Sequence, residues 1–115
     1  MTENTKLCIE QEIEAKGLTA PRITPEIIES KIKIIDFHRL TSVLTVCVLT
    51  LENGFTVTGE SACASPENFN KELGEKIAMK NAESKIWALE GYLLKEKLYQ
   101  AWLSKLAEEM ARNNI

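Results

Sequence analysis

The sequence predicts an α+β fold, in which a small antiparallel sheet of about three strands packs against a long C-terminal helical segment behind a short N-terminal helix. Three observations predict it. A Thr-Pro pair at residues 24 and 25 marks a helix start, an Asn-Gly pair at 53 and 54 joins two strand-like runs, and apolar residues then recur at helical spacing. With 115 residues and 44% apolar content, the chain suits one compact domain, which we place at residues 20–115.

The segments before the sheet are short. Residues 1–19 are polar with few apolar positions, so we expect an N-terminal arm, either frayed or a short helix that docks on a neighbour. Thr24 is predicted to cap a helix over residues 25–31, because Pro25 suits the first helical position. Residues 31–39 alternate in part between apolar and polar side chains and predict the first strand.

The next two strands form a predicted hairpin. Residues 43–52 are almost continuously apolar, which indicates a strand covered on both faces. A two-residue Asn53-Gly54 turn would pair Glu52 with Phe55. In this register, the face expected to take the long helix carries Val46, Val48, Val57 and Gly59. The opposite face, a subunit interface or ligand wall, carries Cys47, Leu49, Leu51, Thr56, Thr58 and Glu60.

The long helix is expected to begin at about Phe69, with Ser65 as its N-cap and Pro66 at its first position, and to continue to about Ala111. Helical spacing gives it two apolar faces. One carries Phe69, Leu73, Ile77 and Trp87, and the other carries Ala78, Ala82, Ile86 and Leu89. Both faces require burial, so we expect a second copy of the chain on one of them. We also expect the helix to break near residues 89–91.

Composition excludes several classes of function. A net charge of −3 argues against a surface that binds DNA or RNA polymers. The three cysteines do not have the spacing of a metal site, and the N-terminus has no signal pattern. We therefore expect reduced thiols in a cytoplasmic protein, with no metal or cofactor. No apolar run approaches the roughly 20 residues of a membrane span.

Catalysis is not indicated by the sequence. His38 has no evident catalytic partner, and Cys63 has no evident base that would make it a nucleophile. No phosphate loop, paired-His motif or carboxylate dyad is present in the sequence. We therefore expect a binding protein and not an enzyme.

A binding site is better indicated. The polar loop of residues 61–68 leads to a helix N-terminus, which attracts anions through its free N–H groups. Phe69 can stack there on a base, or serve only as a core anchor. Asn81, on a narrow polar stripe of the helix, can read a base edge or a ribose. Lys85 and Arg22 can pair with phosphates, although the spacing alone favours a solvated lysine at Lys85.

Six motifs between about residues 20 and 98 together resemble a family of small phage proteins that includes the Thoeris anti-defence sponges. They are Ala-Pro-Arg-Ile-Thr at 20–24, Leu-Thr-Leu-Glu-Asn-Gly-Phe-Thr-Val-Thr-Gly-Glu-Ser-Ala-Cys at 49–63, Pro-Glu-Asn-Phe-Asn at 66–70, Gly-Glu-Lys-Ile-Ala at 74–78, Asn-Ala at 81–82 and Ile-Trp-Ala-Leu-Glu-Gly-Tyr-Leu-Leu at 86–94.

The resemblance implies a non-catalytic protein of the host bacterial cytosol. Such sponges sequester the cyclic ADP-ribose isomers made by TIR-domain sensors, and some also hold cyclic trinucleotides of the CBASS system at separate sites. The resemblance further implies a homodimer or hexamer with ligand at subunit interfaces. The positions that match the family's motifs, with weaker additions from the strands and helix, are Arg22, Thr24, Thr58, Glu60, Phe69, Asn81 and Lys85. At Lys76, Lys80 and Lys95 this chain has lysine where many members of the family have arginine.

Two other functions stay open at this point. One is a protein–protein interaction module of phage origin with no small ligand, which uses the apolar faces of the helix. The other is a hydrolase of the same messenger, against which the missing catalytic constellation argues. The preferred cyclic isomer, the binding of cyclic trinucleotides and the choice between dimer and hexamer are not fixed by the sequence.

Overall fold

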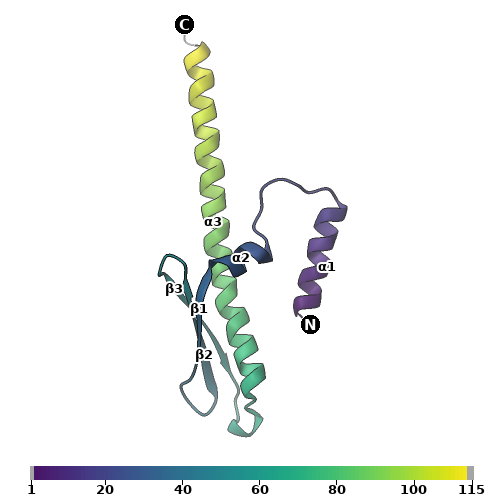
Figure 1. The fold of residues 1–115 in the computed structure, drawn as a ribbon, viewed down its shortest axis with the longest axis vertical. Coiled ribbons are helices and arrows are strands. Elements are labelled where there is room, and N and C mark those ends of the chain that lie inside the picture. The colour runs from purple at the N-terminus through teal and green to yellow at the C-terminus, as the bar shows by residue number, and fades with distance from the viewer. Residues whose placement is uncertain (1, 114–115) are drawn as a thin grey trace.

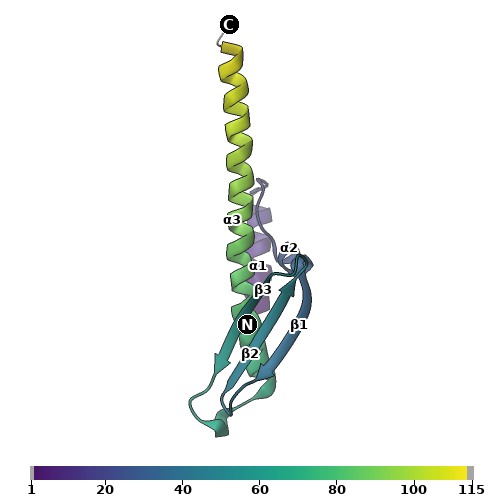
Figure 2. The ribbon, with the colours of Figure 1, turned by 90° about the vertical axis from the view of Figure 1, so that its left-hand side faces the viewer.

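A computed structural model describes residues 2–113 of the chain, with side chains from Ile9 onward. Its elements are α1 (Thr2–Ala15), α2 (Pro25–Lys31), β1 (Ile32–Arg39), β2 (Leu44–Leu51), β3 (Thr56–Ala62), the 3-10 turn η1 (Pro66–Asn68) and α3 (Lys71–Asn113). The strands form an antiparallel sheet in the order β1-β2-β3, and α3 runs along one side of it (Figures 1 and 2). The predicted α+β class is therefore confirmed.

The core lies between the sheet and α3. Its buried side chains come from α2, β2, β3 and α3, and are Ile28, Cys47, Leu49, Leu51, Val57, Ala78, Ala82 and Ile86. Thr24 caps α2 as predicted, since its hydroxyl accepts a hydrogen bond from the backbone N–H of Ile27 at 3.3 Å. Small alanines on α3 let the helix approach the strands closely, and this approach fixes the geometry of the groove described below.

The predicted hairpin register is wrong by one residue. Val48 pairs with Thr58 and Cys47 with Gly59, where a two-residue turn would pair Val48 with Gly59. The Gly54 N–H donates to Leu51 O, the Leu51 N–H donates to Phe55 O, and Gly54 has φ of 90°. This is a three-residue loop that ends in a glycine bulge.

The slip changes which side of β2 is buried. Cys47, Leu49 and Leu51 take the helix, whereas Val46 and Val48 lie on the outer face. The prediction for β3 was correct in part, because Val57 and Gly59 do face α3. The outer face of β2 is only partly buried, so the expected cover on both faces is absent from this single chain.

The predicted start of the long helix is also wrong. Ser65 precedes only the single turn η1, and its side chain makes no capping bond. The true cap is Asn70, whose Oδ1 accepts from the Leu73 N–H at 3.0 Å. The expected break near Gly91 does not occur, because α3 is one continuous helix of 43 residues. Glycine in a helix costs only about 1 kcal/mol and does not by itself end one.

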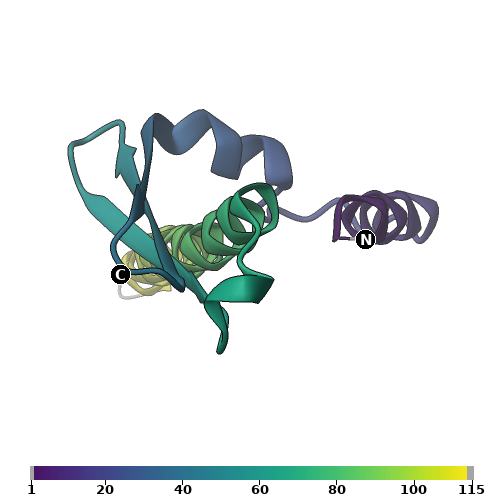
Figure 3. The same cartoon turned by 90° about the horizontal axis from the view of Figure 1, so that it is seen from below.

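Two parts of the molecule lie away from the core. The C-terminal half of α3 projects past the sheet, which gives the molecule extents of 75 × 34 × 23 Å (Figure 1). At the other end of the chain, α1 lies to one side, connected by an extended segment (Figure 3). Of the two open alternatives for the N-terminal arm, the structure has the helix. Within residues 2–113, no helix has both the length and the apolar character of a membrane span.

Candidate functional site

An open groove of about 490 Å3 lies between β3 and α3. It is lined by Phe55, Thr56, Val57, Thr58, Lys85, Ala88, Leu89 and Tyr92. Its walls are mainly apolar and aromatic, with the Lys85 ammonium and the hydroxyls of Thr56, Thr58 and Tyr92 as its polar groups. A concave apolar surface with a few convergent polar groups is the usual form of a small-molecule site.

Gly59 determines how α3 sits on β3 beside this groove. A Cβ atom at Gly59 would overlap the backbone of Ala78 and Ala82, so only glycine lets the helix come this close. The neighbours of Gly59 then bond to the helix on either side of the contact. The Asn81 amide donates to the Glu60 carbonyl oxygen at 2.8 Å, and Lys85 Nζ lies 3.5 Å from Thr58 Oγ1.

Four of the seven predicted site residues are therefore neighbours in the fold: Thr58, Glu60, Asn81 and Lys85. Asn81 and Lys85 are one helical turn apart, and both side chains reach β3. Asn81 is exposed instead of lying between two buried faces, and its partner is a backbone carbonyl. An exposed ammonium above an apolar groove is suited to pair with a phosphate oxygen.

Phe69 lies elsewhere, in a smaller pocket of about 180 Å3 at the other end of the sheet. The Arg39 guanidinium sits 3.6 Å from the centre of the Phe69 ring, which is cation–π geometry. Arg39 also donates to the Ser42 carbonyl oxygen at 2.9 Å. Fifteen helical residues separate Asn70 from Lys85, a span of about 22 Å, so Phe69 and the groove are separate sites within one chain.

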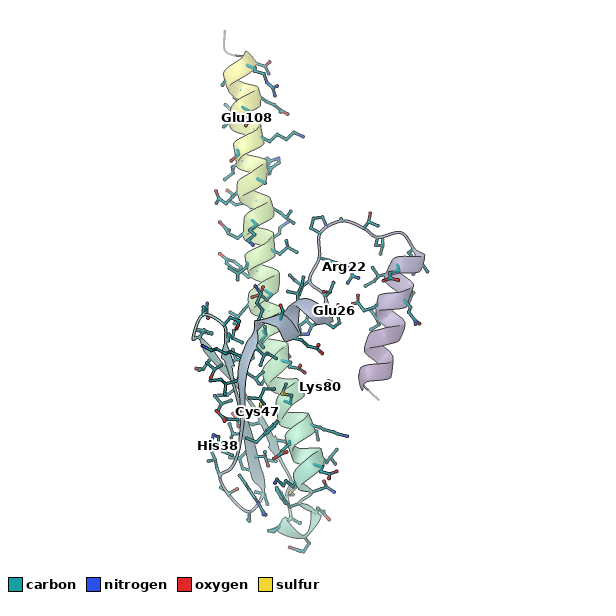
Figure 4. The ribbon with its side chains drawn as sticks, viewed as in Figure 1. Arg22, Glu26, His38, Cys47, Lys80 and Glu108 are labelled. Atoms are coloured by element: carbon teal, nitrogen blue, oxygen red, sulfur yellow. The ribbon has the colours of Figure 1, made fainter. Side chains whose placement is uncertain are left out.

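Arg22 and Thr24 lie in a third place, the segment between α1 and α2, where Figure 4 labels Arg22. Arg22 makes two hydrogen bonds to the Glu10 carboxylate, at 2.6 and 3.1 Å. These bonds lower the pKa of Glu10 and raise the pKa of Arg22. Thr24 is occupied with capping α2. The structure thus distributes the seven predicted residues over three places.

Sequence reasoning missed three residues of these sites. Phe55 and Tyr92 form aromatic walls of the groove, and Arg39 covers Phe69. The correct hairpin loop would have placed Phe55 at the start of β3, beside the helix. Tyr92 follows Leu89 and Lys85 at helical spacing, so a continuous helix would have predicted it there. Arg39 depends on the pairing of β1 with β2, which short sequence patterns do not define.

The thiols and the histidine lie outside the groove lining. Cys47 is fully buried, and its pKa is raised to about 11. Desolvation of the thiol is the main cause, and the negative charges of Glu83, Asp36 and Glu75 add to it. Cys47 and Cys63 are free thiols, whereas the side chain of Cys8 lies outside the described residues. His38 is exposed on the sheet (Figure 4). In the described part of the chain, no three His, Cys, Asp or Glu side chains gather in a way that could hold a metal ion.

Comparison with known proteins gives a match to a protein family. Residues 23–98, about two thirds of the chain, match a family model described as the Phage protein (N4 Gp49/phage Sf6 gene 66) family. No curated protein matches the chain significantly, and neither does any solved structure. The matched segment runs from just before α2 into α3, and it contains both the groove and the Phe69 pocket.

Proposed function

The chain belongs to the N4 Gp49/phage Sf6 gene 66 family of phage proteins, and we propose that it is an anti-defence sponge, which binds and sequesters a cyclic nucleotide immune messenger without cleaving it. The ligand class is that of glyco-cyclic ADP-ribose, with cyclic trinucleotides as further candidates. The observation that supports this proposal is the groove between β3 and α3, where one cationic group stands over apolar and aromatic walls.

Each part of such a ligand has a counterpart in the groove region. A base can stack on the exposed ring of Phe55 or Tyr92, because stacking on aromatic side chains accepts any base. Lys85 can hold a pyrophosphate oxygen. The Glu60 carboxylate lies two residues beyond Thr58 on β3, and the Asn81 amide lies one helical turn before Lys85, both in reach of ribose hydroxyls. A rigid cyclic ligand loses little conformational entropy when it binds such a surface.

A second copy of the chain would complete the site. The groove is open on one side, and Phe69 and Arg22 lie too far away to reach the same ligand within one chain. Leu73 and Ile77 of α3, which are exposed beside the Phe69 pocket, give a second copy an apolar surface to contact. Assembly as a homodimer or hexamer in the bacterial cytosol belongs to this proposal.

Sequestration without cleavage fits the chemistry of the groove. Hydrolysis of a messenger needs a general base or nucleophile beside the scissile bond. The groove lining contains a lysine, two threonines and a tyrosine as its reactive groups. Cys63 and His38 are not among the groove residues.

The experiment is titration calorimetry of purified protein with glyco-cyclic ADP-ribose, with a cyclic trinucleotide as a second arm. Bound ligand is then released by heat and analysed by mass. Recovery of intact messenger supports a sponge, a cleaved product indicates a hydrolase, and no binding in either arm refutes the proposal. At a ligand concentration 100 times the Kd, thermal unfolding should show about 2.7 kcal/mol of added stability.

Lys85→Ala tests whether the groove is the site. Loss of one charge-assisted hydrogen bond costs about 1.5–3 kcal/mol, so the Kd should rise about 10- to 100-fold. Lys105→Ala is the matched control, because Lys105 is an exposed lysine of the same helix that lies 20 residues beyond Lys85. Equal affinity of both variants would place the ligand elsewhere.

The exposed apolar residues of α3 favour one alternative, a protein–protein interaction module of phage origin without a small ligand. The same thermal unfolding experiment separates the two functions. A module of this kind would unfold at the same temperature with and without the nucleotide.

A further inference from the structure

The C-terminal half of α3 has no partner within the described chain. Ile86 is the last fully buried residue of the helix, and the helix continues alone to Asn113 (Figure 1). Residues 92–113 therefore project by about 33 Å. A solitary helix of this length is only marginally stable in water unless another surface covers its apolar side.

One series of residues, which begins just before this projection and runs along it, has alternating spacings of three and four. The positions are Leu89, Tyr92, Glu96, Tyr99, Leu103, Leu106 and Met110. This spacing is the heptad pattern of a coiled coil, and six of its seven positions are apolar or aromatic. Tyr92 is 68% exposed and Met110 is 63% exposed, so the stripe is open to solvent in the single chain. We refer to these seven residues as the tail stripe.

We propose that the tail stripe pairs with the tail stripe of a second copy as an antiparallel two-stranded coiled coil. Glu96 selects this direction. In a parallel pair, the two Glu96 carboxylates would face each other in the core, where like charges repel. In the antiparallel pair, Glu96 lies opposite Leu106 of the second copy, and the two carboxylates are about 15 Å apart along the axis.

The same antiparallel register places opposite charges together at the flanks. With Tyr99 opposite Leu103 of the second copy, Lys95 comes to lie beside Glu109 of the second copy, and Glu109 beside its Lys95. Lys95 directly precedes Glu96 and Glu109 directly precedes Met110, the flanking position of the heptad where charges decide orientation. A parallel pair would instead set Lys95 beside Gln100, which gains no ion pair.

An aromatic cluster marks the two-fold axis of this pair. Tyr99 and Trp102 already stack on each helix, with ring centres 6.2 Å apart. Trp102 is 56% exposed, and in the antiparallel register it meets Trp102 of the second copy. Buried aromatic residues at the centre of an interface contribute much of its binding energy. Near the other end, Met110 of the second copy covers Tyr92, at the rim of the groove.

The mass in solution tests the pairing, with light scattering on the full chain without ligand. We expect the Leu103→Lys variant to have half the molecular mass of the wild type in solution, because the substitution places a charge in the core of the pair. An unchanged mass would overturn the proposal. Lys95→Glu should weaken self-association, and the double variant Lys95→Glu with Glu109→Lys should restore it. A double variant that stays as weak as the single one would also overturn the antiparallel register.

Disulfide trapping tests the direction independently of any loss of folding. Gln100→Cys lies on the two-fold axis, so oxidation should give a covalent dimer above the background set by the native cysteines. Glu108→Cys, on the outward side of the helix, is the control and should stay at background. A covalent dimer from Glu96→Cys, but not from Gln100→Cys, would show a parallel pair and refute the proposal. Because both tests omit nucleotide, their outcome is independent of messenger binding.

Discussion

Among the glycines of the chain, Gly59 has the least room for a side chain. Its missing side chain makes room for the backbone of Ala78 and Ala82, and a backbone cannot swing away as a side chain can. We expect Gly59→Ala to lower the free energy of unfolding by about 3 kcal/mol or more, because overpacking a dense core forces strands and helices apart. Urea unfolding followed by circular dichroism measures this.

Gly91→Ala is the matched control for that substitution. A Cβ at Gly91 would meet nothing within 4 Å, and Gly91 lies inside α3. The same chemical change should therefore raise the stability by about 0.5–1 kcal/mol, since alanine loses less backbone entropy in a helix. Two substitutions of equal effect would mean that α3 does not touch β3 at Gly59.

Cys47 makes the stability depend on alkaline pH. Burial raises the pKa of its thiol from 9.0 to about 11, so the folded protein holds this proton more tightly than the unfolded chain does. The contribution is fully present below pH 9 and is lost as the pH rises through about 11. The loss amounts to about 2–3 kcal/mol.

Comparison with Cys47→Ala isolates this effect from the titration of lysines and tyrosines. Urea midpoints are measured from pH 8 to 11 for both proteins. We expect the wild type to lose more stability than the variant over this range. Parallel curves would show that the thiol is accessible to water in the folded state.

At the scale of elements, the cap of α3 gives a sharp comparison. Asn70 accepts a hydrogen bond from the Leu73 N–H, whereas Ser65 makes no capping bond. We expect Asn70→Ala to lower the free energy of unfolding by about 1 kcal/mol, and Ser65→Ala to leave it within about 0.5 kcal/mol. Thermal unfolding of the two variants measures the difference. The reverse order would restore Ser65 as the functional start of the helix.

Elements with strong local signals were predictable from the sequence. Thr24 and Pro25 defined α2 to the residue, and the β-branched run defined β2 within one residue at each end. The hairpin register was not predictable from Asn53-Gly54 alone, because this pair suits both a two-residue turn and a three-residue loop with Gly54 in the bulge. One residue of uncertainty there exchanges the buried and exposed faces of β2.

The candidate site was less predictable than the fold. Asn81 and Lys85 were predicted from the narrow polar stripe of the helix. Thr58 and Glu60 were predicted on the hairpin face away from the helix, yet the Thr58 hydroxyl and the Glu60 backbone carbonyl both contact it. Phe69, Arg22 and Thr24 were placed with them by resemblance, and in this single chain each has another neighbour. Short-range patterns give the face on which a residue lies, but not which distant faces meet.

For the whole molecule, the arrangement of surfaces connects fold and assembly. The core is small, and one face of the sheet and much of α3 remain uncovered in a single copy. The groove lies beside the point where the part of α3 that packs on the sheet passes into the part that projects. Copies that join along either part of α3 would therefore alter the openness of the groove, so binding and assembly should influence each other.

An ion pair between Arg22 and Glu10 links α1 to the segment before α2, and we expect acid to release it. The Arg22 hydrogen bonds lower the pKa of Glu10, so the pair is intact above the usual pKa of a glutamate and is lost as the pH falls through the lowered value. Glu10→Gln should release α1 at neutral pH in the same way. Hydrogen exchange followed by mass spectrometry should then show faster exchange over residues 9–15.

Glu12→Gln, which removes an exposed pair with Lys16 within the same helix, is the control. Because α1 lies outside the core, unfolding of residues 25–91 should be unchanged in both variants, and a loss of core stability in Glu10→Gln would show that α1 is part of the folded domain.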